Sequence, residues 1–80
     1  MDDSEIVQRI HRLVEDEHRL NETHQGEFAS DEDRHRMREL EVALDQCWDL
    51  LRQRRALRET GQDPDQASVR PEGQVEGYLN

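Results

Sequence analysis

The sequence predicts an all-α protein, an antiparallel two-helix hairpin with an extended C-terminal tail, which we expect to form a four-helix bundle as a homodimer. Three observations predict this class. Apolar residues recur at helical spacing in two stretches, helix-capping residues precede both stretches, and both prolines and three of the four glycines follow residue 60.

The first helix is expected over about residues 3–25. Asp2 and Glu5 stand three residues apart, as in a capping pair, and Gly26 marks the end of the helix. One apolar seam runs along it, widened on one side by two valines, and consists of Ile6, Ile10, Leu13 and Leu20 with Val7 and Val14. This pattern predicts one amphipathic helix.

The second helix is expected over about residues 31–60, after Ser30 as the N-cap and before Gly61 and Pro64. Its apolar residues are Met37, Leu40, Ala43, Leu44, Cys47, Trp48, Leu50, Leu51 and Leu57. At about 100° per residue they cover an arc of about 180°, which is too wide for one facing helix to bury. The uncovered part of this arc predicts association with a second copy.

Folding about a turn near residue 27 places Ile6 of the first helix near Trp48 of the second. Cys47 and Trp48 are both expected to pack in the core, because both lie on the apolar arc. The residues expected at an interface are Leu40, Leu44, Cys47, Trp48, Leu50, Leu51, Arg54, Leu57, Arg58 and Tyr78.

Residues 61–80 are expected to form an extended or partly disordered tail that follows a hairpin domain of residues 1–60. The apolar anchors of the tail are Val69, Val75, Tyr78 and Leu79. We expect the tail to fold back, in its own chain or across a dimer, onto the second helix near Leu50 and Leu57, where its acids would meet arginines. The alternative is a free linker.

The chain carries 20 acidic residues and a net charge of −9, and its one basic patch is the arginine cluster of residues 52–58. A chain this acidic mostly repels phosphates, so we expect no nucleic-acid partner. The cluster is expected to pair with acids of the tail or with Asp2, Asp3 and Glu5. No run reaches the roughly 18 apolar residues of a membrane span, so we expect a cytoplasmic protein.

The residues offer no Ser-His-Asp arrangement, glycine-rich phosphate loop or pair of pocket carboxylates, so we expect no enzymatic activity and no cofactor. The leading hypothesis is a non-enzymatic interaction or regulatory module that presents its arginine-rich helix end and tail to a protein partner. The alternative is a small metal-binding protein that uses His11, Glu15 and His18 on one outer helix face. These ligands lack an enclosing shell, so we predict no metal site there.

Three segments are distinctive beyond this pattern: LDQCWDLLRQRRALRE at residues 44–59, VRP at residues 69–71 and VEGYL at residues 75–79. With them the chain resembles a family of short uncharacterised actinobacterial proteins that are about as long as this one. The resemblance spans essentially the whole chain, and it implies a bacterial protein whose tail is a genuine part of it. Because the function of that family is unknown, the resemblance implies no catalytic residue.

Overall fold

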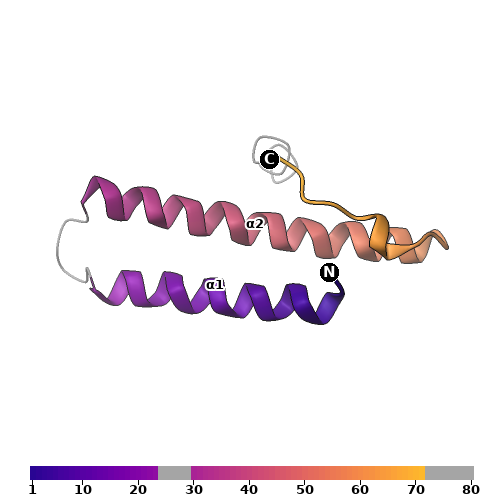
Figure 1. Cartoon of the computed structure of the whole chain (residues 1–80), viewed down its shortest axis with the longest axis horizontal. Helices are drawn as coiled ribbons and strands as arrows, with labels where there is room; N and C mark the ends of the chain where they lie inside the picture. The colour runs from indigo at the N-terminus through magenta and orange to yellow at the C-terminus, as the bar shows by residue number, and fades with distance from the viewer. Residues whose placement is uncertain (24–29, 72–80) are drawn as a thin grey trace.

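The computed structural model describes residues 1–23 and 30–71, which form helices α1 (Asp3–Thr23) and α2 (Asp31–Glu59) and the short 3-10 helix η1 (Pro64–Gln66). Figure 1 shows α1 and α2 side by side and antiparallel, with η1 beside the C-terminal end of α2. The described residues contain no strand. The predicted class, an all-α helical hairpin, is confirmed.

Helix α1 begins where the sequence predicts, because its first turn is capped in both directions. The Asp2 carboxylate accepts a hydrogen bond from the Glu5 backbone N–H at 2.8 Å, and the Asp2 N–H donates to the Glu5 carboxylate at 3.4 Å. The helix continues to Thr23, and the predicted end near residue 25 lies outside the described residues.

Helix α2 is also bounded by local signals. Ser30 Oγ accepts a hydrogen bond from the Asp33 N–H at 3.1 Å, and the Asp33 carboxylate accepts one from the Ser30 N–H at 3.4 Å. After the last turn, the N–H groups of Gly61 and Gln62 donate to helix carbonyls at 3.1 and 2.8 Å, in the crossed pattern of a Schellman motif. Gly61 has a φ of 76°, a left-handed conformation that favours glycine.

The core of the hairpin is small and apolar. Ile6 and Ile10 of α1 cluster with Cys47 and Leu50 of α2, and each of the four is less than a tenth exposed. Partly buried residues that pack against this cluster are Leu13, Leu44, Leu51 and Ala67. The core therefore follows the predicted seam of α1 but takes in only part of the apolar arc of α2.

Trp48 does not belong to this core. It is 48% exposed, so the prediction that it packs in the core near Ile6 is wrong, whereas the prediction for Cys47 is confirmed. The position of each residue around the helix gives the reason. Trp48 lies about 100° beyond Cys47 and about 160° from Leu50, so α1 cannot cover all three side chains at once.

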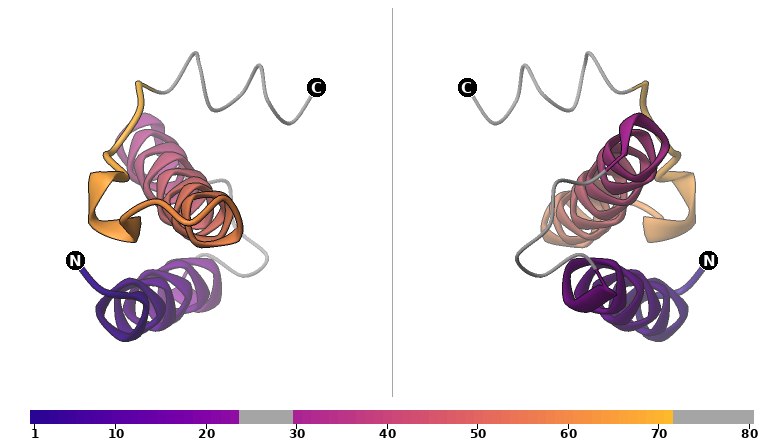
Figure 2. Two further views of the ribbon diagram at one scale, coloured as in Figure 1. Left: turned by 90° about the vertical axis from the view of Figure 1, so that its right-hand side faces the viewer. Right: turned by 90° about the vertical axis from the view of Figure 1, so that its left-hand side faces the viewer.

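Residues 62–71, here called the strap, turn back from the end of α2 and run along it in the opposite direction (Figure 1). Ala67 of the strap packs against the core cluster. In the end-on views of Figure 2, η1 lies beside α2 on the same side of the hairpin as the N-terminus. The prediction that the tail folds back is confirmed for the strap, within its own chain. The other predicted anchors, Val75, Tyr78 and Leu79, lie outside the described residues.

The strap changes how the broad face of α2 is covered. Helix α1 covers the side of α2 that contains Cys47, and the strap covers the side that contains Asp49 and Gln53. Within the described part of the chain, the side with Trp48 stays open. The homodimer inferred from the width of the apolar arc of α2 remains a prediction. Because the strap covers part of α2, the surface left for a second copy is smaller than the sequence indicated.

Replacing Leu50 with alanine tests the composition of the core. We expect Leu50→Ala to lower the free energy of unfolding by about 2–5 kcal/mol, because it leaves a cavity in a packed cluster. Val69→Ala is the control, since Val69 is 61% exposed and its truncation should change stability by less than about 0.5 kcal/mol. Urea unfolding followed by circular dichroism measures both, and equal losses would contradict the assignment.

Candidate protein-interaction site

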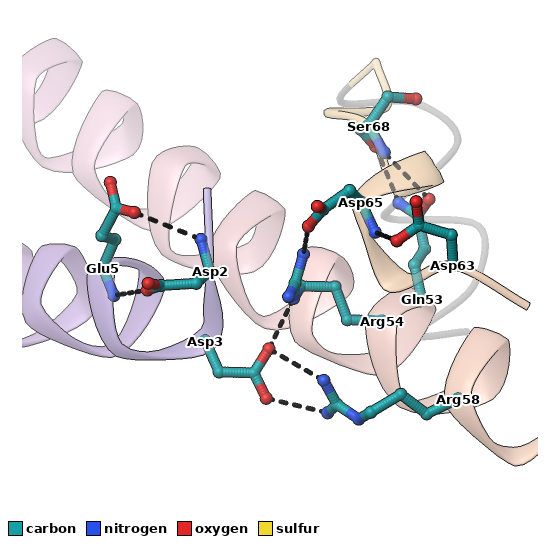
Figure 3. A network of polar contacts seen from close by, with 9 residues as sticks. All are labelled: Asp2, Asp3, Glu5, Gln53, Arg54, Arg58, Asp63, Asp65 and Ser68. Carbon is teal, nitrogen blue, oxygen red and sulfur yellow. Dashed lines mark hydrogen bonds and ion pairs between the residues drawn. The ribbon is translucent and has the colours of Figure 1, made fainter.

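A buried arginine joins three segments at the end of the hairpin away from the turn (Figure 3). The Arg54 guanidinium donates Nε–H to Asp3 in the first turn of α1 and Nη1–H to Asp65 of η1, the latter at 3.0 Å. Arg58 donates to both oxygens of Asp3, at 2.8 and 3.2 Å. The predicted pairing of the arginine cluster with the acids of the first helix and of the tail is confirmed for these residues.

These ion pairs show that two arginines at the end of α2 are bound by acids of the same chain. Hydrogen bonds from Arg58 and then Arg54 lower the pKa of Asp3, and Asp3 and Asp65 raise the pKa of Arg54. Arg54 is buried and Arg58 is held by Asp3, so both serve the fold of the chain itself. Presentation of this end to a protein partner remains a prediction, for which Arg54 is buried and Arg58 is exposed.

A second polar cluster holds the strap against the middle of α2. Asp49 is fully buried, and its carboxylate accepts two hydrogen bonds from Arg70, one of them from Nε at 2.8 Å. The Gln53 amide donates to the same carboxylate at 2.8 Å. The hydrogen bonds from Arg70 outweigh burial and lower the pKa of Asp49, so this carboxylate stays charged inside the structure.

The strap backbone also bonds to side chains of α2. The Gln53 amide donates to the Ser68 carbonyl at 2.8 Å and accepts from the Ser68 N–H at 3.3 Å. Gln46 donates to the Arg70 carbonyl at 3.2 Å. Val69, a predicted apolar anchor, is instead 61% exposed. Polar bonds, rather than the expected apolar anchors, therefore hold the described part of the tail.

Sequence reasoning missed the residues of this second cluster, although one signal was present. Gln46, Asp49 and Gln53 are spaced by three and four residues, which places them on one flank of a helix. Asp49 also interrupts the apolar run between Trp48 and Leu50. An acid in such a run indicates a nearby cation, because an unpaired buried charge is costly.

A crevice of about 230 Å³ lies between α1, α2 and the strap. It is lined by Met1, Ile6, Leu50, Arg54, Asp65, Ala67, Ser68 and Val69. Its charged groups, Arg54 and Asp65, are bound to each other. The crevice therefore offers an apolar floor with a closed ion pair, and not a carboxylate or imidazole directed at a bound molecule.

The opposite side of the hairpin, here called the open face, carries exposed apolar side chains. Arg9 of α1 and Gln46 of α2 line the same small crevice as Val69 of the strap, so the other flanks of the two antiparallel helices share the opposite side. These flanks expose Val7, Val14 and Trp48, with Leu44 and Leu51 half-buried between the helices. Exposed apolar side chains gathered on one face are typical of an interaction surface.

The residues predicted for an interface divide according to their burial. Leu40, Cys47, Leu50 and Arg54 are buried within the chain, while Leu44, Leu51 and Leu57 are half-buried and Trp48 and Arg58 are exposed. Tyr78 lies outside the described residues. Of this set, Leu44, Trp48 and Leu51 lie on the open face, and their role in an interface between molecules remains a prediction.

The histidines of α1 do not gather into a metal site in the described part of the chain. No group of three His, Cys, Asp or Glu side chains is placed there to hold an ion, including His11, Glu15 and His18. His18 Nε2 instead lies 3.0 Å from the Glu22 carboxylate. Cys47 is buried, and burial raises the pKa of its thiol, which disfavours the reactive thiolate. No helix among the described residues is long and apolar enough to cross a membrane.

The fold and these surfaces define a small helical hairpin that is closed on one side by a polar strap and open on the other. Residues 2–80 match the family of proteins of unknown function called DUF2630, and the chain belongs to this family. The resemblance to short uncharacterised actinobacterial proteins is confirmed by relatives from Mycobacterium.

Two such relatives are similar to the chain over most of their length. The chain is 52% identical over 77 residues to uncharacterised protein Rv0898c of Mycobacterium tuberculosis strain ATCC 25618 / H37Rv, a match that covers 95% of this chain and 88% of the relative. The same figures apply to uncharacterised protein Mb0922c of Mycobacterium bovis. No solved structure gives a significant match.

Breaking the contact between Asp49 and Arg70 tests whether the strap is fastened as described. We expect Arg70→Ala and Asp49→Asn each to lower the free energy of unfolding by about 1–3 kcal/mol, because the first leaves the buried Asp49 carboxylate, and the second the half-buried Arg70 guanidinium, without its charged partner. The double variant should lose less than the sum of the two single losses, since both remove one interaction. Additive losses in urea unfolding would show that the two residues act separately.

The pH dependence of the strap provides a further test. The folded-state pKa of Asp49 is lowered from its ordinary value of 3.8, so the stability that it contributes is present above 3.8 and is lost as pH falls through the lower, folded-state value. In an NMR titration, the carboxyl carbon of Asp49 should shift with a midpoint below 3.8, together with the Ser68 amide. In Arg70→Ala the midpoint should rise; an unchanged midpoint would contradict the contact.

Proposed function

We propose that the protein is a non-enzymatic interaction module whose open face receives a helix of a protein partner. The observation that carries this proposal is the gathering of Val7, Val14 and Trp48 on one side of the hairpin while the strap covers another side. Two antiparallel helices with half-buried leucines between exposed apolar side chains suit a third helix, whose apolar side chains would pack against them.

Trp48 is the residue on which this surface would depend most. Tryptophan contributes a large apolar area with little loss of conformational freedom, and it is enriched among the residues that dominate binding energy. The half-buried Leu44 and Leu51 lie one turn before and one turn after it on α2. A bound helix would cover all three and shield them from water.

The polar groups of the described chain support a binding role over a catalytic one. Arg54, Asp3 and Asp65 bind one another, and Asp49 is held by Arg70 and Gln53. Each group is used to join segments of the chain. Association by the hairpin therefore leaves these contacts in place and uses the apolar surface that the fold leaves open.

Site-specific photocrosslinking tests the proposal. Benzoylphenylalanine in place of Trp48 reacts with groups that contact the open face, and the same residue in place of Glu39 is the control on another exposed part of α2. In cells that produce the protein, we expect discrete crosslinked species from position 48 and not from position 39. Adding Val14→Asp should weaken those crosslinks, because it places a charge on the open face.

Two results would contradict the proposed function. Equal crosslinking from positions 48 and 39 would show that reaction follows exposure alone. The absence of crosslinks from position 48, in protein whose helical circular dichroism matches the original chain, would show that no partner occupies the open face. In both cases Trp48 would be an exposed side chain without a binding role.

A further inference from the structure

Side chains along the open edge of α2 are arranged symmetrically about Trp48. Glu41 lies seven residues before Trp48 and Arg55 lies seven residues after it, so the three share one helical stripe. Leu44 and Leu51 lie four residues before and three residues after Trp48. Glu41 and Arg55 are exposed, and the two leucines are half-buried. Along this stripe Trp48 is followed in each direction by a leucine and then by a charged residue, which is acidic toward the N-terminus and basic toward the C-terminus.

Antiparallel packing of two such helices would match this pattern with itself. Residues at equal distances before and after Trp48 then lie opposite each other, so Glu41 of one copy meets Arg55 of the other, twice by symmetry. Leu51 of the other copy lies one residue from the position opposite Leu44, close enough for the two side chains to pack together. Parallel packing would place Glu41 beside Glu41 and Arg55 beside Arg55, which is repulsive in both places.

We infer that the partner on the open face is a second copy of this chain, with its α2 antiparallel and Trp48 at the two-fold axis. The inference rests on the proposed function, because it names the partner of that same face. From Glu41 to Arg55 this side of α2 carries two acids, Glu41 and Asp45, two bases, Arg52 and Arg55, and apolar residues between them. It therefore offers no net charge to attract a strongly basic or acidic helix, whereas it complements itself.

The size of the face is sufficient for such an interface. Helix α2 has 29 residues. With Trp48 at the two-fold axis, the two copies of α2 overlap over residues 37–59. At 1.5 Å per residue this overlap is about 34 Å long, so a contact about 24 Å wide, which includes the flank of α1, would supply the roughly 800 Å² per partner of a standard interface. Val7 and Val14 of α1 provide the apolar width beside α2. Two hairpins joined in this way form a four-helix arrangement.

The ion pair of Arg55 within its own chain does not prevent it from binding Glu41 of a second copy. Arg55 Nε lies 3.1 Å from the Glu59 carboxylate in the same chain, and both side chains are well exposed. An exposed pair of this kind contributes little to stability, so Arg55 can turn to a carboxylate of another copy at small cost.

Sedimentation equilibrium of charge-reversed variants, at tens of micromolar protein, tests the antiparallel arrangement of the dimer. We expect the original chain to be a dimer, and both Glu41→Arg and Arg55→Glu to weaken dimerisation by at least about tenfold, because each makes two facing pairs repulsive. The double variant Glu41→Arg, Arg55→Glu should recover dimerisation. An equimolar mixture of the two single variants should form a heterodimer, in which both facing pairs attract again.

Glu39→Arg is the matched control, since it makes the same change of charge two residues from Glu41 on a different side of α2. Lowering the net negative charge should by itself favour association, so weaker dimerisation of Glu41→Arg cannot come from net charge. An equal effect of Glu39→Arg, or no recovery in the double variant, would overturn the antiparallel arrangement. Circular dichroism of each variant confirms that the helices are retained.

The outcome separates this inference from the proposed function. A monomeric original chain whose position 48 still crosslinks to a different protein would overturn self-association and retain the interaction module. A monomer without crosslinks at position 48 would overturn both. A dimer that follows the charge-reversal pattern, with crosslinks from position 48 to a second copy, would support both.

Discussion

The buried guanidinium of Arg54 is the contact on which the placement of the three described segments depends. It binds Asp3 at the start of α1 and Asp65 of η1 while it belongs to α2 itself. A guanidinium suits this role because its donors point in fixed directions, whereas the ammonium group of a lysine is a compact charge without such a fork. Removing one carboxylate would leave a buried charge partly uncompensated, so the segments must come together as a set.

The strap achieves with polar bonds what a third helix would achieve with apolar packing. An extended segment leaves its backbone N–H and C=O groups without partners of its own, and covering them is costly unless a neighbour supplies partners. Helix α2 supplies them through Gln46 and Gln53, and Asp49 receives the guanidinium of Arg70. Ala67 adds only a small apolar side chain to the core. The strap therefore covers one side of α2 without enlarging the core and leaves the side of Trp48 open.

The two helices were predictable from the sequence because the signals that bound them are local. The caps at Asp2 and Ser30 and the stop at Gly61 act over three or four residues, so their order along the chain reveals them. The place of Trp48 is not a local property. An apolar arc shows which side chains avoid water, but the part of the arc that α1 reaches depends on how the two helices rotate against each other. The contact of Asp49 with Arg70 spans 21 residues and depends on the path of the strap, which periodicity does not describe.

The acidity of the chain, which opposes association in general, also favours the antiparallel arrangement over the parallel one. At the turn end of the hairpin, residues 15–23 and 30–38 carry seven acids against four arginines. Residues 1–14 and 45–71, at the other end, carry eight acids against seven arginines. Parallel packing would bring the two acidic ends together, whereas antiparallel packing separates them by much of a helix length of about 43 Å, well beyond the roughly 8 Å over which charges act at physiological salt. Repulsion between the turn ends and attraction between Glu41 and Arg55 therefore both favour the antiparallel dimer over the parallel one.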